Sequence, residues 1–192
     1  MRYMADGLTR AGYQTLAPTL PTTLGSLESC TRKLENFLQG RLMGYDKVHF
    51  VGHSMGGLVV RCFLSRNRIP SPGRCVLCGV PNRGVFLARP FARYPLFRRT
   101  VRILPALTPP GIPIGPPLNR PSPDIGLVGG TYNRGLAFGF LFGARSDGRV
   151  PVDSLSMEGS KDTAWLPMNH HKIHRSPEGL SLVLRFLETG HF

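Results

Sequence analysis

Gly52-His53-Ser54-Met55-Gly56-Gly57 stands between two apolar runs, Lys47-Val48-His49-Phe50-Val51 before it and Leu58-Val59-Val60-Arg61-Cys62-Phe63-Leu64 after it. The first run predicts a buried strand and the second a helix, so a G-x-S-x-G motif falls on the turn between them. A serine on such a turn has a strained backbone, and the chain passes so close to its neighbours that we expect only glycine to fit at Gly52 and Gly56. The motif therefore predicts a nucleophilic Ser54 at the carboxyl edge of a sheet.

The same turn predicts a hydrogen-bond donor. The backbone N–H of Met55 opens the expected helix, where it has no partner within the helix and where the helix dipole favours negative charge. We therefore expect it to donate to an oxyanion that forms beside Ser54. A glycine-rich loop with a passive serine is the plainer alternative, and the apolar runs on both sides argue against it.

Helical and strand patterns alternate along the rest of the chain. Ser176 as a cap, Pro177 at the first position and Gly190 as a stop mark the ends of the last helix. This alternation predicts an α/β fold, with a mostly parallel sheet flanked by helices. The expected helices cover residues 1–11, 26–42, 55–67 and 177–189, and the expected strands cover residues 13–17, 47–51, 74–80, 125–129 and 163–168.

Length and composition indicate a single domain over residues 1–192, with 41% hydrophobic and 18% charged residues. No apolar run reaches the roughly 18 to 20 residues of a membrane helix. No signal peptide is visible either, which slightly favours a cytoplasmic location. The four cysteines give no disulfide framework in a chain of this length. Cys75 and Cys78 have C-x-x-C spacing but lie in an expected buried strand, so we do not expect a metal there.

The net charge of +13 comes mostly from arginine. Arginines and aromatic residues alternate most densely between Arg83 and Arg102, a pattern that could contact an anionic lipid surface or nucleic acid. Arginine is also scattered through the other segments, which favours a solvated basic surface over a dedicated binding patch. No nucleic-acid-binding signature is present, so a nucleic-acid partner is not expected, while peripheral contact with anionic lipid stays open.

Eight prolines lie between positions 105 and 123 (Pro105, Pro109, Pro110, Pro113, Pro116, Pro117, Pro121 and Pro123), which excludes a regular helix or a central strand there. A long irregular excursion in a compact domain usually has a use. Together with the arginine and aromatic stretch before it, this segment predicts a cap or lid over residues 86–123.

A nucleophilic serine needs a base, and the base needs an orienting acid. With the chain order serine, acid, histidine, the candidate bases are His170, His171, His174 and His191. His170 follows the last expected strand immediately, so it is the preferred base, with His171 as the main rival.

The preferred acid is Asp147, in the turn Ser146-Asp147-Gly148. A carboxylate on a turn after the strand over 125–129 can reach sideways towards a histidine on the neighbouring loop. Because Asp-Gly is also a common turn dipeptide, Asp153 and Asp124 stay open as alternatives.

The chain resembles the bacterial lipases and carboxylesterases of the α/β-hydrolase superfamily over nearly its whole length. The matching segments are Val48 to Gly57, Gly79-Val80-Pro81-Asn82-Arg83-Gly84, Ser146 to Pro151, and His170 with the helix from Pro177 to Gly190. The resemblance implies hydrolysis of a small acyl ester or a lipid through an acyl-enzyme on Ser54, with Asp147 and His170 completing the triad and with no metal or organic cofactor. It specifies neither the acyl chain nor the oligomeric state.

One departure from this family pattern concerns the start of the chain. Relatives of this kind open with a strand and a His-Gly loop that supplies a second oxyanion-hole N–H, whereas here Met1 already begins the first helix. The resemblance therefore implies an amino-terminally shortened relative, and one lost oxyanion donor costs about 3 to 4 kcal/mol of transition-state stabilisation. Two functions stay open: an active serine esterase, and a catalytically impaired relative that binds a ligand or partner.

Overall fold

The computed structural model describes residues 1–22, 25–84, 114–132 and 145–192. In these residues one sheet has the strand order β1-β2-β3-β4, and every neighbouring pair is parallel. The strands are β1 (Val48–His53), β2 (Pro72–Cys78), β3 (Asp124–Gly130) and β4 (Asp162–Leu166). Because all four strands run in the same direction, their carboxyl ends lie at one edge of the sheet, where ligands of open α/β sheets bind.

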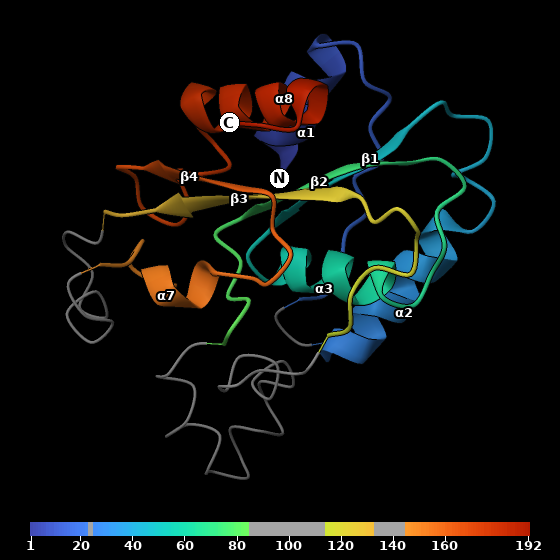
Figure 1. The fold of residues 1–192 in the computed structure, drawn as a ribbon, viewed down its shortest axis with the longest axis horizontal. Coiled ribbons are helices and arrows are strands. Elements are labelled where there is room, and N and C mark those ends of the chain that lie inside the picture. Colours follow the sequence, from blue (N-terminus) through green and yellow to red (C-terminus); the bar gives the residue numbers. More distant parts are fainter. Residues whose placement is uncertain (23–24, 85–113, 133–144) are drawn as a thin grey trace, which may run out of the picture.

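Helices cover both faces of this sheet (Figure 1). One face carries α1 (Arg2–Arg10) and α8 (Pro177–Thr189), and the other carries α2 (Leu27–Leu38), α3 (Met55–Leu64) and the short α7 (Val152–Leu155). The predicted α/β architecture with a parallel sheet flanked by helices is confirmed.

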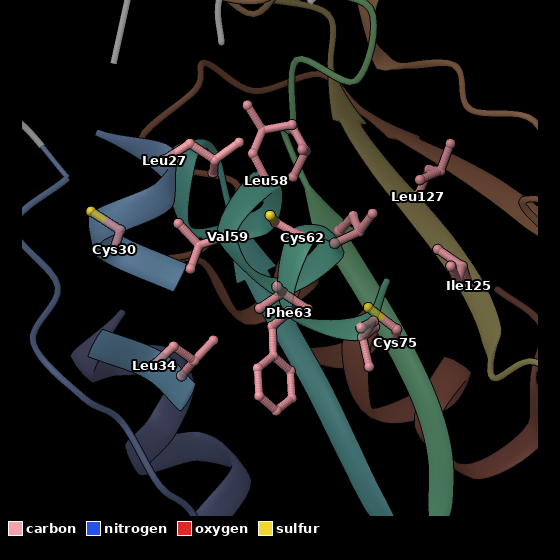
Figure 2. Close-up of a cluster of buried hydrophobic side chains, with 14 of the residues drawn as sticks. Leu27, Cys30, Leu34, Leu58, Val59, Cys62, Phe63, Cys75, Ile125 and Leu127 are labelled. Carbon is pink, nitrogen blue, oxygen red and sulfur yellow. The ribbon is translucent and has the colours of Figure 1, made fainter. Parts of the chain in front are cut away.

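Alternate residues of β2 and β3 supply two separate cores, as the twofold period of a strand requires. One core contains Cys75, Ile125 and Leu127, which pack with α2 and α3 (Figure 2), together with Leu77. The other contains Val76, Cys78 and Val128, which pack with α1 and α8. Cys75 and Cys78 therefore lie on opposite faces of the sheet and cannot share a metal ion. Burial raises the pKa of both thiols to about 12.

The last helix ends where the sequence predicts. The hydroxyl of Ser176 accepts the Gly179 N–H at 3.0 Å, Pro177 opens the helix, and Gly190 closes it in the left-handed conformation at φ 83°. This helix places its buried face against β2 and β3 and so fixes the loop before it.

The strand expected over residues 13–17 does not form. A strand needs a ladder partner, and among the described residues β1 pairs only with β2. Tyr13 instead donates its N–H to the carbonyl of Leu8 at the end of α1, and the residues after it are irregular.

The helices over 26–42 and 55–67 are shorter than expected, since α2 ends at Leu38 and α3 at Leu64.

The cap expected over residues 86–123 stays a prediction, because residues 86–113 lie outside the described part of the chain. Residues 114–123 are irregular and attached to the body of the protein: the buried Asn119 side chain bonds both the N–H and the carbonyl of Ile69. No helix in the described ranges is both long and apolar enough to span a membrane.

Candidate active site

The backbone of Ser54 is strained. Its φ of 51° and ψ of −126° make it the one non-glycine residue with positive φ in the described residues. Such a conformation costs on the order of 1 to 3 kcal/mol and persists because the surroundings impose it. The Ser54 N–H bonds the Cys78 carbonyl at the end of β2, and its own carbonyl accepts the Gly57 N–H, each at 3.0 Å. The serine is thereby held between β1 and α3 at the carboxyl edge.

Close packing at this turn requires glycine at Gly52, as predicted, because an added Cβ would lie 2.5 Å from the Gly57 Cα. The same prediction for Gly56 is wrong: a Cβ there would meet nothing within 4 Å in the described residues. The close contact falls one residue later, where a Cβ on Gly57 would lie 2.2 Å from a methyl group of Val80. Because α3 begins at Met55, Gly57 and not Gly56 faces Val80, which follows β2.

Met55 is the first residue of α3, so its N–H has no acceptor within the helix. Its place directly after Ser54 is the one expected for an oxyanion donor.

The structure brings Asp147 and His170 together. Asp147 Oδ2 lies 2.7 Å from His170 Nδ1, and the two residues are 1% and 3% exposed. Their backbones are also joined, since the His170 N–H donates to the Asp147 carbonyl at 2.9 Å. A carboxylate accepts from Nδ1–H, which leaves Nε2 free to accept a proton.

The second carboxylate oxygen is held by the acid loop itself. Asp147 Oδ1 accepts the N–H groups of Arg149 at 2.9 Å and of Val150 at 2.7 Å. Gly79, after β2, leaves room for the pair, because a Cβ there would lie 3.2 Å from His170 Nδ1 and its φ of 56° already favours glycine. Loop and sheet edge therefore fix both oxygens of the acid.

The alternative acids lie elsewhere. Asp124 stands at the amino end of β3, away from this edge, where its carboxylate bonds Lys161 at 2.8 Å. Asp153 is exposed in the first turn of α7.

The alternative histidines differ from His170 in their surroundings. His171 is exposed, and His191 lies in the tail beside Asp162. His174 is buried, and its ring nitrogen Nδ1 has no partner among the described residues.

His53, which the sequence reasoning did not single out, lies against the base. Its Nε2 is 3.0 Å from the His170 carbonyl oxygen. The centroid of its ring lies 4.6 Å from the ring centroid of His170 and 3.9 Å from that of His174. These contacts place His170 beside the residue that precedes Ser54. In the described residues, no hydrogen bond joins the Ser54 hydroxyl to the His170 ring.

Comparisons with known proteins agree with the fold described above. The family model described as "Alpha/beta hydrolase family" matches residues 2–183. No curated protein matches the chain.

Among solved structures, the chain is similar to the mature form of the lipase BlEst2 from Bacillus licheniformis, with a TM-score of 0.65, 18% identity, and coverage of 96% of this chain and 82% of that one. It is also similar to the metagenomic carboxyl esterase MGS0156, with a TM-score of 0.70, 16% identity, and coverage of 97% and 69%. A third is YbtT, a type II thioesterase from the yersiniabactin biosynthetic pathway, with a TM-score of 0.54, 16% identity, and coverage of 86% and 75%. At such identities these likenesses establish the fold alone.

Proposed function

This chain belongs to the alpha/beta hydrolase family, and we propose that it cleaves carboxylic esters through an acyl-enzyme on Ser54, with His170 as the base and Asp147 as the orienting acid. One observation carries the proposal: a serine in a strained turn and a buried Asp147–His170 pair, with 2.7 Å between Oδ2 and Nδ1, stand at the same edge of the sheet. Strain at one residue and a buried polar pair are costly features that a site concerned only with folding does not need.

In the first half of the reaction, His170 Nε2 takes the proton of the Ser54 hydroxyl while Oγ attacks the ester carbonyl carbon. The Met55 N–H donates to the oxyanion of the tetrahedral intermediate. When the carbon–oxygen bond to the alcohol breaks, His170 passes its proton to the leaving oxygen. An acyl ester on Ser54 and a free alcohol result.

In the second half, water replaces the alcohol. His170 takes a proton from water, the hydroxide attacks the acyl carbon, and the proton returns to Ser54 Oγ as the acid leaves. Asp147 orients and stabilises the imidazolium in both halves. The bond between Ser54 and His170 is expected to form when substrate closes the site, since such bonds are often long in free enzymes.

The substrate class is an uncharged acyl ester or lipid, as for the lipase and the carboxyl esterase of similar fold; an acyl thioester, the substrate class of a thioesterase, is the alternative. A series of nitrophenyl esters of increasing chain length and one matched thioester separates these classes. Hydrolysis of the thioester at a higher kcat/KM than the ester of equal length would contradict the ester assignment.

Covalent labelling tests the nucleophile. A fluorophosphonate probe should modify Ser54, and Ser54→Ala should abolish the labelling. Ser65→Ala is the matched control, because Ser65 lies at the other end of α3 and its hydroxyl bonds only the Cys62 carbonyl among the described residues. A wild-type protein that folds but neither reacts with the probe nor hydrolyses any ester of the series would favour the alternative, an impaired relative that binds a ligand or partner.

A further inference from the structure

His53 connects the nucleophile and the base without a role in the proton transfers. It is the last residue of β1 and directly precedes Ser54. A backbone carbonyl can only accept, so the 3.0 Å contact between His53 Nε2 and the His170 carbonyl oxygen is a bond that His53 donates. The two rings also pack together, with centroids 4.6 Å apart. His53 therefore contacts both the backbone and the side chain of the base.

This connection spans the sheet. Ser54 follows β1 and His170 follows β4, and these strands are separated by β2 and β3 in the sheet order. A base must come within hydrogen-bond reach of its nucleophile, so two loops from different strands have to keep a fixed relative position. The His53 bond is a direct link between them, across 117 positions of sequence.

His174 supports the ring of His53. The two rings stack with centroids 3.9 Å apart and planes 36° apart. The Arg175 Nε–H donates to His174 Nε2 at 3.2 Å, so Nδ1 carries the proton, and this buried N–H has no acceptor among the described residues. An unpaired buried donor is destabilising. A purely structural position would be better filled by an apolar ring.

Both supporting rings are neutral at ordinary pH. Burial, and then the neighbouring His170 and His174, lower the pKa of His53 to about 2. Burial and the amino terminus of the chain lower the pKa of His174 to about 4. A charged ring would repel the imidazolium that His170 forms while it holds the serine proton. Neutral rings can pack against both charge states of the base.

We propose that His53 is a positioning residue that fixes His170 relative to Ser54, and that His174 holds the His53 ring in place. This role rests on the proposed function, because it concerns the same site. It predicts an effect on the chemical step and not on substrate binding, since His53 contacts the base itself and acts through the position of His170.

Two substitutions separate the bond from the ring. His53→Phe keeps a ring but removes the donor, and kcat for a nitrophenyl ester should fall roughly 10- to 100-fold, the effect of a displacement of about 1 Å at a catalytic group. KM should stay within about twofold. His53→Gln places an amide nitrogen near the position of Nε2 and should recover part of the loss.

His49→Phe is the matched control for effects on folding. His49 lies on the same strand, and its Nδ1 accepts the Arg74 N–H at 3.0 Å at the other end of β1. Its kcat should equal that of the wild type once the folded fraction is measured by thermal unfolding. If His53→Phe does not fold, His174→Ala, which leaves the His53 ring without its support, should lower kcat in the same direction.

The outcomes distinguish the two proposals. If the wild type is active and His53→Phe folds with an unchanged kcat, the positioning role alone is overturned. If His53→Phe does not fold, an unchanged kcat in His174→Ala overturns it in the same way. An equal loss in His49→Phe overturns it as well, because the effect is then general. A wild type without ester hydrolysis or probe labelling overturns the proposed function and the positioning role with it.

Discussion

Asp147→Asn removes one charge from the buried pair and changes almost no volume. The carboxylate has two separate tasks: Oδ2 lies 2.7 Å from His170 Nδ1, and Oδ1 accepts the N–H groups of Arg149 and Val150 at 2.9 and 2.7 Å. An asparagine has one oxygen and one NH2 group, so it can perform only one of these tasks well. The orientation of the new amide determines which ring nitrogen of His170 carries the proton.

The loop decides this orientation. If the amide oxygen turned towards His170, two backbone donors of the loop would lose their acceptor. The buried N–H of Val150 alone would then cost about 1 to 3 kcal/mol. If the amide oxygen keeps accepting the N–H groups of Arg149 and Val150, the NH2 group faces His170 Nδ1 and only the contact with His170 is altered. The second arrangement wins, and His170 must then accept at Nδ1 and carry its proton on Nε2. A protonated Nε2 cannot take the proton of Ser54.

We therefore expect Asp147→Asn to lower kcat by about four orders of magnitude, equivalent to about 5.5 kcal/mol in the barrier, with the fold retained. The assay is ester turnover together with the rate of fluorophosphonate labelling, and circular dichroism reports the fold. Asp153→Asn is the control, because Asp153 is exposed on α7. Loss of less than about tenfold in Asp147→Asn, or an equal loss in Asp153→Asn, would refute this reasoning.

The strain at Ser54 predicts that the free energy of unfolding, measured in urea, is about 1 kcal/mol higher for Ser54→Gly than for Ser54→Ala. Glycine adopts φ 51° without the steric conflict of a Cβ. Equal free energies of unfolding would show that the turn is not strained. The pKa values of His53 and His174 are lowered to about 2 and about 4. Below about pH 6.5, the ordinary pKa of histidine, the unfolded chain therefore binds more protons than the folded one. The free energy of unfolding should consequently fall as the pH drops from about 6.5 towards 4. In urea titrations at pH 7, 6, 5 and 4, His53→Phe should reduce this slope by about 1.4 kcal/mol per pH unit, and a slope equal to that of the wild type would contradict the burial of His53.

Local patterns were sufficient for most of the elements. The apolar run before Gly52 is β1, the helix after Ser54 is α3, and the cap and stop of α8 stand at Ser176 and Gly190. Each of these features depends on neighbours within a few residues, through strand alternation, helix capping and turn conformation. The strand expected over residues 13–17 failed for the opposite reason, since its formation depends on a ladder partner that local sequence does not contain.

The candidate site divides in the same way. Ser54 and the Met55 N–H follow from the motif itself, whereas the sequence left His171 beside His170, and Asp153 and Asp124 beside Asp147. Only the tertiary structure shows that Asp147 and His170 are in contact, because the 2.7 Å contact joins residues 23 positions apart whose loops meet through the pairing of β3 with β4. His53 shows this most clearly: it stands inside the motif, yet its contact with His170 depends on the order of four strands, which no short stretch of chain encodes.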